Sequence, residues 1–112
     1  MDLSEIKSLK QAISIEVKNH IENLGTFKNF EIDEVRSVFM EDRYFNHLSN
    51  SIFQGTPFKI DFILGTIDIV YRQGTSKIHN PSIAPRFAVS NLMAQYNHKE
   101  KKFEVLGLET LK

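Results

Sequence analysis

The stretch from Phe58 to Gln73, FKIDFILGTIDIVYRQ, constrains the fold of this chain more than any other segment. Apolar and polar residues alternate on both sides of Gly65-Thr66, which is the pattern of two half-buried β-strands. Glycine suits the first position of a type II′ turn, where φ must be positive, so the sequence predicts a hairpin that reverses at Gly65-Thr66. This hairpin would place six apolar side chains on one side of the ribbon: Ile60, Phe62, Leu64, Ile67, Ile69 and Tyr71.

Residues 3–24 have the periodicity of an amphipathic helix, because their apolar residues recur at spacings of three and four. Gly25 follows at the position where helices commonly end in the left-handed conformation. Asp2 and Glu5 have the spacing of a capping box, which indicates that the helix begins next to them. The expected buried stripe consists of Ile6, Leu9, Ile13, Val17, Ile21 and Leu24.

Residues 27–54 are open to two interpretations. Their first part alternates as a strand as far as Met40, with a bulge expected near residues 33–36. The apolar residues that follow have helical spacing and predict a short second helix around residues 43–54. The alternative is a hairpin that turns at Glu41-Asp42, a turn that lacks the Gly or Asn such connections favour.

The C-terminal part of the chain predicts two more strands, at residues 86–96 and 102–111. Tyr96 and Phe103 would face each other across the connecting loop as an aromatic cross-strand pair. Gly107 inside the last strand indicates a bulge.

These elements define an α+β fold in a single domain spanning residues 1–112, with the N-terminal amphipathic helix packed on an antiparallel sheet of four to five strands. One helix cannot cover both faces of such a sheet. Apolar residues left on the second face predict contact with a protein partner or a homodimer, through the sheet face or a strand edge. These residues are Ile63, Val70, Ala88, Leu92 and Leu106.

Composition restricts the class of protein. The chain has no cysteine, which excludes disulfides, thiolate metal sites and cysteine nucleophiles. The N-terminus does not resemble a secretory signal, and no apolar run approaches the ~20 residues that cross a bilayer. We therefore expect a cytoplasmic protein that does not enter a membrane. A small, cysteine-free chain rich in Lys, Ile, Asn and Phe is typical of proteins encoded by AT-rich bacterial or phage genomes.

The charges balance, with 14 basic and 14 acidic residues, which argues against a protein that coats nucleic acid. The two halves differ, however. Residues 1–56 carry a net charge of −3 and residues 57–112 a net charge of +3. Between Arg72 and Lys102 the net charge reaches +5.

No catalytic motif is present in the sequence. The four histidines lack the spacing of helix-borne metal ligands, and no serine occupies a Gly-x-Ser-x-Gly turn. The paired carboxylates, such as Glu41 with Asp42, lie in polar surroundings that would not raise a pKa. We therefore expect no catalytic residues, no metal and no cofactor.

The irregular segment 73–85 is the expected binding site, because rigid strands hold such loops in place for recognition. Backbone N–H groups at residues 74–76 could form an anion-binding nest, with basic side chains around it. The candidate binding residues are Arg72, Thr75, Ser76, Lys77, His79 and Arg86.

The sequence favours a non-enzymatic binding module that acts by protein–protein contact, in a regulatory, inhibitor or immunity role. One alternative is binding of nucleic acid, nucleotides or other anions by the basic region 72–102. A second alternative is a small enzyme with a pocket between helix and sheet, using His79 or His47 as acid or base.

Overall fold

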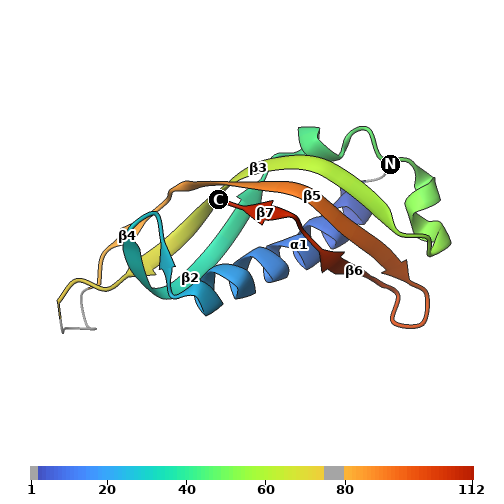
Figure 1. The fold of residues 1–112 in the computed structure, drawn as a ribbon. Coiled ribbons are helices and arrows are strands. Elements are labelled where there is room, and N and C mark those ends of the chain that lie inside the picture. Colours follow the sequence, from blue (N-terminus) through green and yellow to red (C-terminus); the bar gives the residue numbers. More distant parts are fainter. Residues whose placement is uncertain (1–2, 75–79) are drawn as a thin grey trace.

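The computed structural model describes residues 3–74 and 80–112 as one helix covered by an antiparallel sheet. Figure 1 shows the sheet arching over α1 (Leu3–Leu24), which lies on its concave side. The predicted α+β class is therefore confirmed. The strands are β1 (Thr26–Phe27), β2 (Phe30–Met40), β3 (Phe58–Tyr71), β4 (Ser82–Ile83), β5 (Arg86–Asn97), β6 (Lys102–Gly107) and β7 (Thr110–Leu111).

The sheet runs in the order β1-β2-β3-β5-β6, with β4 paired to β3 and β7 paired to β5. The two strands off this path are short. β4 lies in line with β5 along β3, and β7 lies in line with β6 along β5, so the five-strand path agrees with the predicted four to five strands. No helix among the described residues is long and apolar enough to span a membrane.

The N-terminal helix has the predicted bounds and buries the predicted stripe, from Ile6 to Ile21, against the sheet. Leu24 is the exception, since it lies at the C-terminal end of the helix and is 56% exposed. Gly25 has a φ of +76°, which confirms the left-handed ending. The capping box expected at Asp2 and Glu5 lies outside the residues whose side chains are described.

The hairpin predicted at Gly65-Thr66 is wrong, because β3 continues through both residues as one strand of 14 residues. Gly65 pairs with Met40 of β2 on one side and with Phe87 of β5 on the other. Glycine is required here by close packing rather than by a turn. A Cβ atom at this position would lie 2.5 Å from ring carbons of Phe87 and would also strike the carbonyl oxygen of Phe39.

The chain reverses instead between Tyr71 and Ser82. Val70 pairs with Ser82 and Ile69 with Ile83, so β4 returns along β3. The N–H of Tyr71 donates to the carbonyl of Pro81, and this bond continues the ladder toward the turn. The alternating pattern that suggested two short strands therefore belongs to one long strand.

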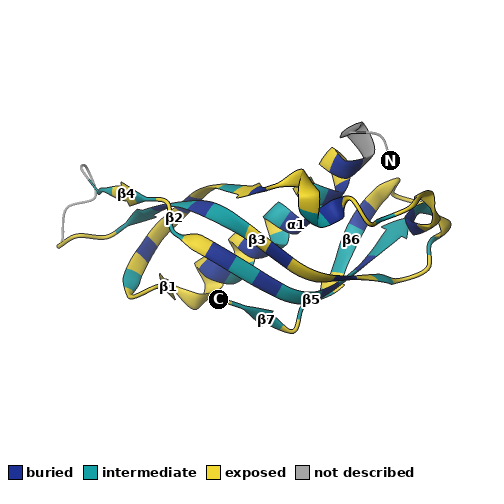
Figure 2. Ribbon diagram, turned by 90° about the horizontal axis from the view of Figure 1, so that it is seen from above, coloured by how far each residue is buried: buried dark blue, intermediate teal, exposed yellow. Residues whose placement is uncertain are grey.

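A continuous strand changes which residues share a face. Ile63, Ile67 and Ile69 lie on one side and are fully buried. Phe62 and Leu64, which the hairpin would have buried, are 45% and 36% exposed. Figure 2 shows the resulting mixture of buried and exposed positions along β3 and β5.

The paired strands β3 and β5 bend where Asn91 adopts a φ of +50°. Phe87 and Val89 are buried before this residue, whereas Leu92 and Ala94 are buried after it. The buried face of β5 therefore switches from odd to even positions. A left-handed residue within a strand has this effect because it breaks the two-residue alternation.

The segment between β2 and β3 differs from the predicted second helix around residues 43–54. It contains two 3₁₀ helices, η1 (Asp42–Phe45) and η2 (Asn50–Gln54). Each turn contributes one fully packed residue, Phe45 in η1 and Ile52 in η2, so the apolar spacing is satisfied without a continuous helix. The alternative hairpin at Glu41-Asp42 does not form.

The predictions for the remaining strands hold with small changes. Register shifts in β2 between Ile32 and Ser37 confirm the expected bulge. Tyr96 pairs with Phe103, with ring centroids 5.0 Å apart. The last predicted strand is divided after Gly107 into β6 and β7, where the register with β5 also shifts.

Candidate interaction surface

The structure describes two of the six predicted binding residues, Arg72 and Arg86. The Nε atom of Arg72 lies 3.4 Å from a carboxylate oxygen of Asp33, in the acidic first half of the chain. Arg86 begins β5 and pairs with Thr66. Arg72 comes six positions after Thr66, just beyond the end of β3, which is about 20 Å along the strand direction, so the two arginines do not converge. The other four residues, Thr75, Ser76, Lys77 and His79, lie outside the described residues, and their role stays a prediction.

The other described basic residues of the region 72–102 do not gather around Arg86. Lys99, Lys101 and Lys102 lie at the hairpin between β5 and β6. This hairpin is at the opposite end of β5 from Arg86, about 36 Å away along the strand. The basic side chains that the structure describes are therefore spread along the molecule.

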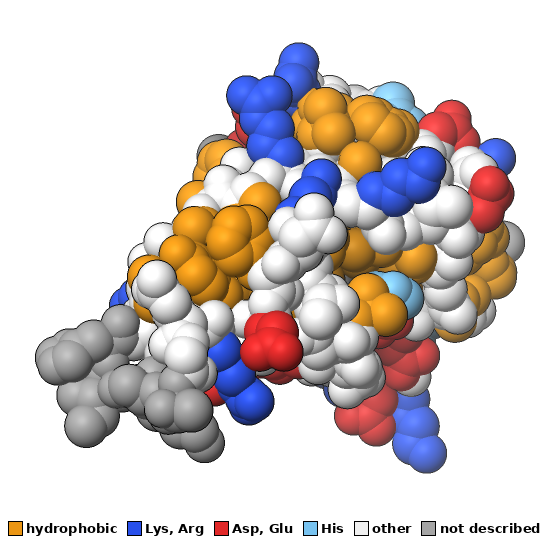
Figure 3. Space-filling model, turned by 60° about the vertical axis from the view of Figure 1, so that its left-hand side comes forward, with side chains coloured by type: hydrophobic (Ala, Val, Ile, Leu, Met, Phe, Trp, Pro, Cys, Tyr) orange, Lys and Arg blue, Asp and Glu red, His pale blue; other side chains and the backbone are white. Residues whose placement is uncertain are grey.

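Exposed apolar side chains do gather on the convex side of the sheet, opposite α1. Cross-strand pairing places Phe39, Thr66 and Arg86 in one row and Leu64 beside Ala88 in the next. Figure 3 shows hydrophobic side chains at the top of the molecule with Lys and Arg beside them. We give the name convex surface to the outward-facing residues Phe39, Arg43, Tyr44, Phe62, Leu64 and Arg86.

A stack of three side chains from η1 and β3 organises the centre of the convex surface. The ring of Tyr44 meets the ring of Phe62 edge-on, with centroids 6.3 Å apart. The guanidinium carbon of Arg43 lies 4.9 Å from the centre of the Tyr44 ring, and its Nη2 donates to the tyrosine hydroxyl at 2.9 Å. Glu41 holds Arg43 from the other side with a 2.6 Å ion pair. The stack is therefore formed before any partner binds.

Beside this stack is a shallow recess of about 200 Å³. The residues that line it are Glu41, Arg43, Tyr44, Leu64, Gly65, Thr66 and Arg86. Arg86 takes part in none of the ion pairs between described residues. The recess therefore combines the apolar side chain of Leu64 with the guanidinium of Arg86, whereas the carboxylate of Glu41 in the same recess is paired with Arg43.

Phe39 extends the convex surface to the edge of β2 and is 62% exposed. The Nζ atom of Lys10 lies 5.9 Å from the centre of its ring and 2.7 Å from a carboxylate oxygen of Asp42. These contacts connect α1, β2 and η1 at this edge, so the exposed ring is held by its neighbours.

The sequence missed most of this surface. Of the residues expected on the second sheet face, Ile63 and Leu92 are buried, whereas Leu106 is 52% exposed. The two apolar residues that do face outward at the centre, Phe62 and Leu64, were assigned to the core. Their alternation with Ile63 was the available signal, but it could be interpreted only after the position of the turn was known.

An open groove of about 430 Å³ lies between α1 and β6, where the enzyme alternative requires a pocket. Its ionisable residues are Glu16, Lys102 and Glu104, and no histidine lines it. His47 follows η1 and is exposed, away from this groove. The described part of the groove therefore lacks the histidine acid or base that the enzyme alternative requires.

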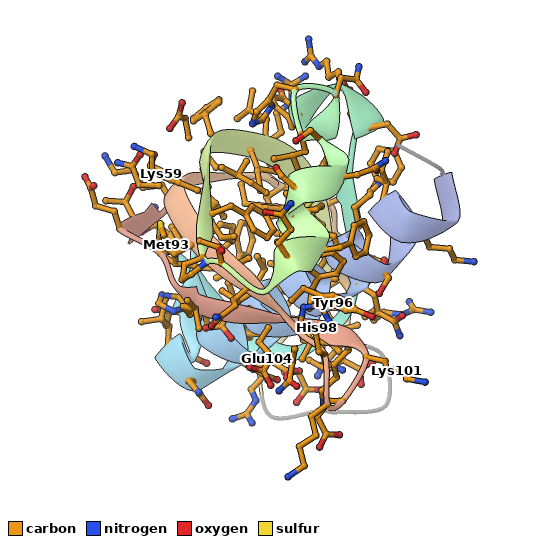
Figure 4. The ribbon with its side chains drawn as sticks, turned by 90° about the vertical axis from the view of Figure 1, so that its right-hand side faces the viewer. Lys59, Met93, Tyr96, His98, Lys101 and Glu104 are labelled. Atoms are coloured by element: carbon orange, nitrogen blue, oxygen red, sulfur yellow. The ribbon has the colours of Figure 1, made fainter. Side chains whose placement is uncertain are left out.

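A second recess, of about 280 Å³, lies where β5 and β6 meet η2. Figure 4 shows His98 beside Tyr96 at this end, with Glu104 nearby. The rings of His98 and Tyr96 stack with centroids 5.2 Å apart, and Gln95 donates to the carbonyl of Gly55. A Cβ atom on Gly55 would lie 3.2 Å from the His98 ring. These side chains hold the end of η2, so packing explains their arrangement.

No group of three or more potential metal-ligating side chains occurs within residues 3–74 and 80–112. Comparison of the chain with protein-family models, curated proteins and solved structures found no match.

Proposed function

We propose that this protein is a non-enzymatic binding module that contacts a partner protein through the convex surface. The observation that carries this proposal is the preformed stack of Arg43, Tyr44 and Phe62 beside exposed Leu64. Tyrosine and arginine are enriched among residues that dominate protein–protein binding energy. Because the stack is already ordered, little side-chain entropy is lost when a partner binds.

The recess indicates the chemistry of the partner. Its apolar wall, Leu64, accommodates an aliphatic or aromatic side chain, and Arg86 supplies a guanidinium without a described ion-pair partner. Arginine binds carboxylates through two parallel hydrogen bonds. We infer a partner segment in which an apolar residue stands next to Asp or Glu.

Selection of a random peptide library displayed on phage tests this proposal. Enriched peptides should contain an apolar residue beside an acidic one, and their affinity should fall about tenfold or more for Arg86→Glu and for Phe62→Ser. Affinities of synthetic peptides are measured by calorimetry with the purified protein and each variant.

Two matched variants keep the test specific. Lys59→Glu reverses an exposed charge on β3, and Leu24→Ser removes an exposed apolar side chain at the end of α1. Both should bind the selected peptides as the unmodified protein does. Peptides that bind Arg86→Glu and Phe62→Ser with unchanged affinity would contradict the proposal.

A further inference from the structure

Strand β6 forms one edge of the sheet, because β5 alone pairs with it. An edge strand presents backbone N–H and C=O groups to which another strand can bind. At the opposite edge, a side chain of α1 binds the backbone. There the N–H of Val35 in β2 donates to the carboxylate of Glu22 in α1 at 3.1 Å. No described side chain makes such a bond to the backbone of β6.

The groove between α1 and β6 runs beside this open edge. Ile15 lies on the helix wall of the groove. It is 54% exposed because it is outside the buried stripe of α1. Ala12 on the same wall is half-buried. A strand added next to β6 would lie over this groove and shield both apolar side chains.

We propose that this edge pairs, antiparallel, with β6 of a second copy of the chain, forming a two-fold symmetric dimer. In such a pair every residue faces a partner residue on the same side of the sheet. The central residue faces its own copy, and the symmetry axis passes between the two. A pair centred on Phe103 sets Lys102 opposite Glu104 of the partner subunit. Symmetry repeats this contact, so the interface contains two pairs of opposite charge.

Other registers are less favourable. A pair centred on Glu104 would set two carboxylates opposite each other, which is destabilising. A pair centred on Val105 would set Lys102 opposite Leu108 of the partner subunit and so leave Lys102 without its carboxylate. The sequence of β6 is therefore self-complementary in the register centred on Phe103.

In the single chain, Lys102 and Glu104 are both available for these cross-subunit ion pairs. Lys102 is exposed and takes part in none of the ion pairs between described residues. Glu104 is held by Asn97, whose Nδ2 donates to Oε1 at 2.9 Å. The second carboxylate oxygen, Oε2, accepts no hydrogen bond from any described residue. One oxygen thus fixes the carboxylate and the other remains for the partner subunit.

The interface is smaller than the ~1,200–2,000 Å² of stable complexes, because a six-residue strand and a few groove residues form it. We therefore expect a reversible dimer with a dissociation constant in the micromolar range. None of the residues that define the convex surface lines the groove between α1 and β6, so the dimer and the proposed partner binding are independent and fail separately.

Analytical ultracentrifugation from about 1 to 500 μM, bracketing the affinity expected of a small interface, tests the proposal. The 13.0 kDa chain should approach twice its mass at the upper end. Lys102→Glu and Glu104→Lys should each raise the dissociation constant at least about tenfold, because like charges then face each other. The double variant that carries both changes should have a dissociation constant within about threefold of that of the unmodified protein, since opposite charges again face each other.

Arg36→Glu is the matched control, because Arg36 is an exposed residue of the edge strand β2 that makes no ion pair with any described residue, and its reversal should leave the dimer unchanged. Circular dichroism verifies that each variant is folded. A chain that stays at 13.0 kDa throughout would overturn the proposal. So would single variants that dimerise normally, or a folded double variant that does not recover.

Discussion

Gly65→Ala is expected to lower the free energy of unfolding by about 3 kcal/mol or more, at the upper end of what overpacking a core costs. The added methyl group would lie 2.5 Å from ring carbons of Phe87, which is 1% exposed and has no space to withdraw. The backbone cannot shift either, because Gly65 pairs with strands on both sides. Urea unfolding followed by circular dichroism measures the loss.

Gly107→Ala provides the control for this experiment. A Cβ atom on Gly107 meets no atom within 4 Å, so the change should alter stability by only about 0.5 kcal/mol. Phe87→Leu combined with Gly65→Ala should cost less than the sum of the two single changes, since the smaller side chain makes room for the methyl group. Equal stability of the two glycine variants would contradict the close packing at Gly65.

Phe45→Ala should destabilise the protein by about 3–5 kcal/mol, the usual cost of removing a buried aromatic ring. Phe45 is fully buried although it belongs to a 3₁₀ helix in the segment between two strands. Its loss should open a cavity in the shared core rather than loosen only that segment. Thermal unfolding should therefore remain a single transition at a lower midpoint.

A substitution at the neighbouring residue, Tyr44, distinguishes an effect on stability from an effect on binding. Tyr44 is half-buried on the outer side of the sheet, where its ring contacts Phe62. Tyr44→Ala should lower the free energy of unfolding less than Phe45→Ala does. It should, however, lower the affinity of the protein for the peptides that bind the convex surface. A Tyr44→Ala variant that unfolds as easily as Phe45→Ala would show that the stack belongs to the core.

The helix was predictable from the sequence because its signal is local. Residues 3–24 repeat at helical spacing, and Gly25 ends the helix as its conformational freedom allows. The pairing of Tyr96 with Phe103 was equally accessible, since a short loop joins their strands. In both cases the residues that determine the structure lie close together in the chain.

Gly65 shows where this reasoning fails. Glycine is required in tight turns and also where two backbones or a ring approach closely, and local sequence does not distinguish these uses. The neighbours that decide between them, Phe39 and Phe87, lie more than 20 residues away in the chain. The predicted turn placed Phe62 and Leu64 on the same face as Ile67 and Ile69, whereas a continuous strand places even and odd positions on opposite faces. The candidate surface was missed for this reason.

The hydrogen bond from Val35 to Glu22 has a consequence for how far this sheet can grow. A protein with two accessible edges can join copies head to tail into filaments, because each addition leaves a fresh edge exposed. Here the helix supplies a carboxylate to β2, which occupies a backbone donor that an incoming strand would need. The association that we propose through β6 would use the same edge of both copies. Such an assembly would close at two chains instead of extending into a fibre, because each addition would leave no second accessible edge.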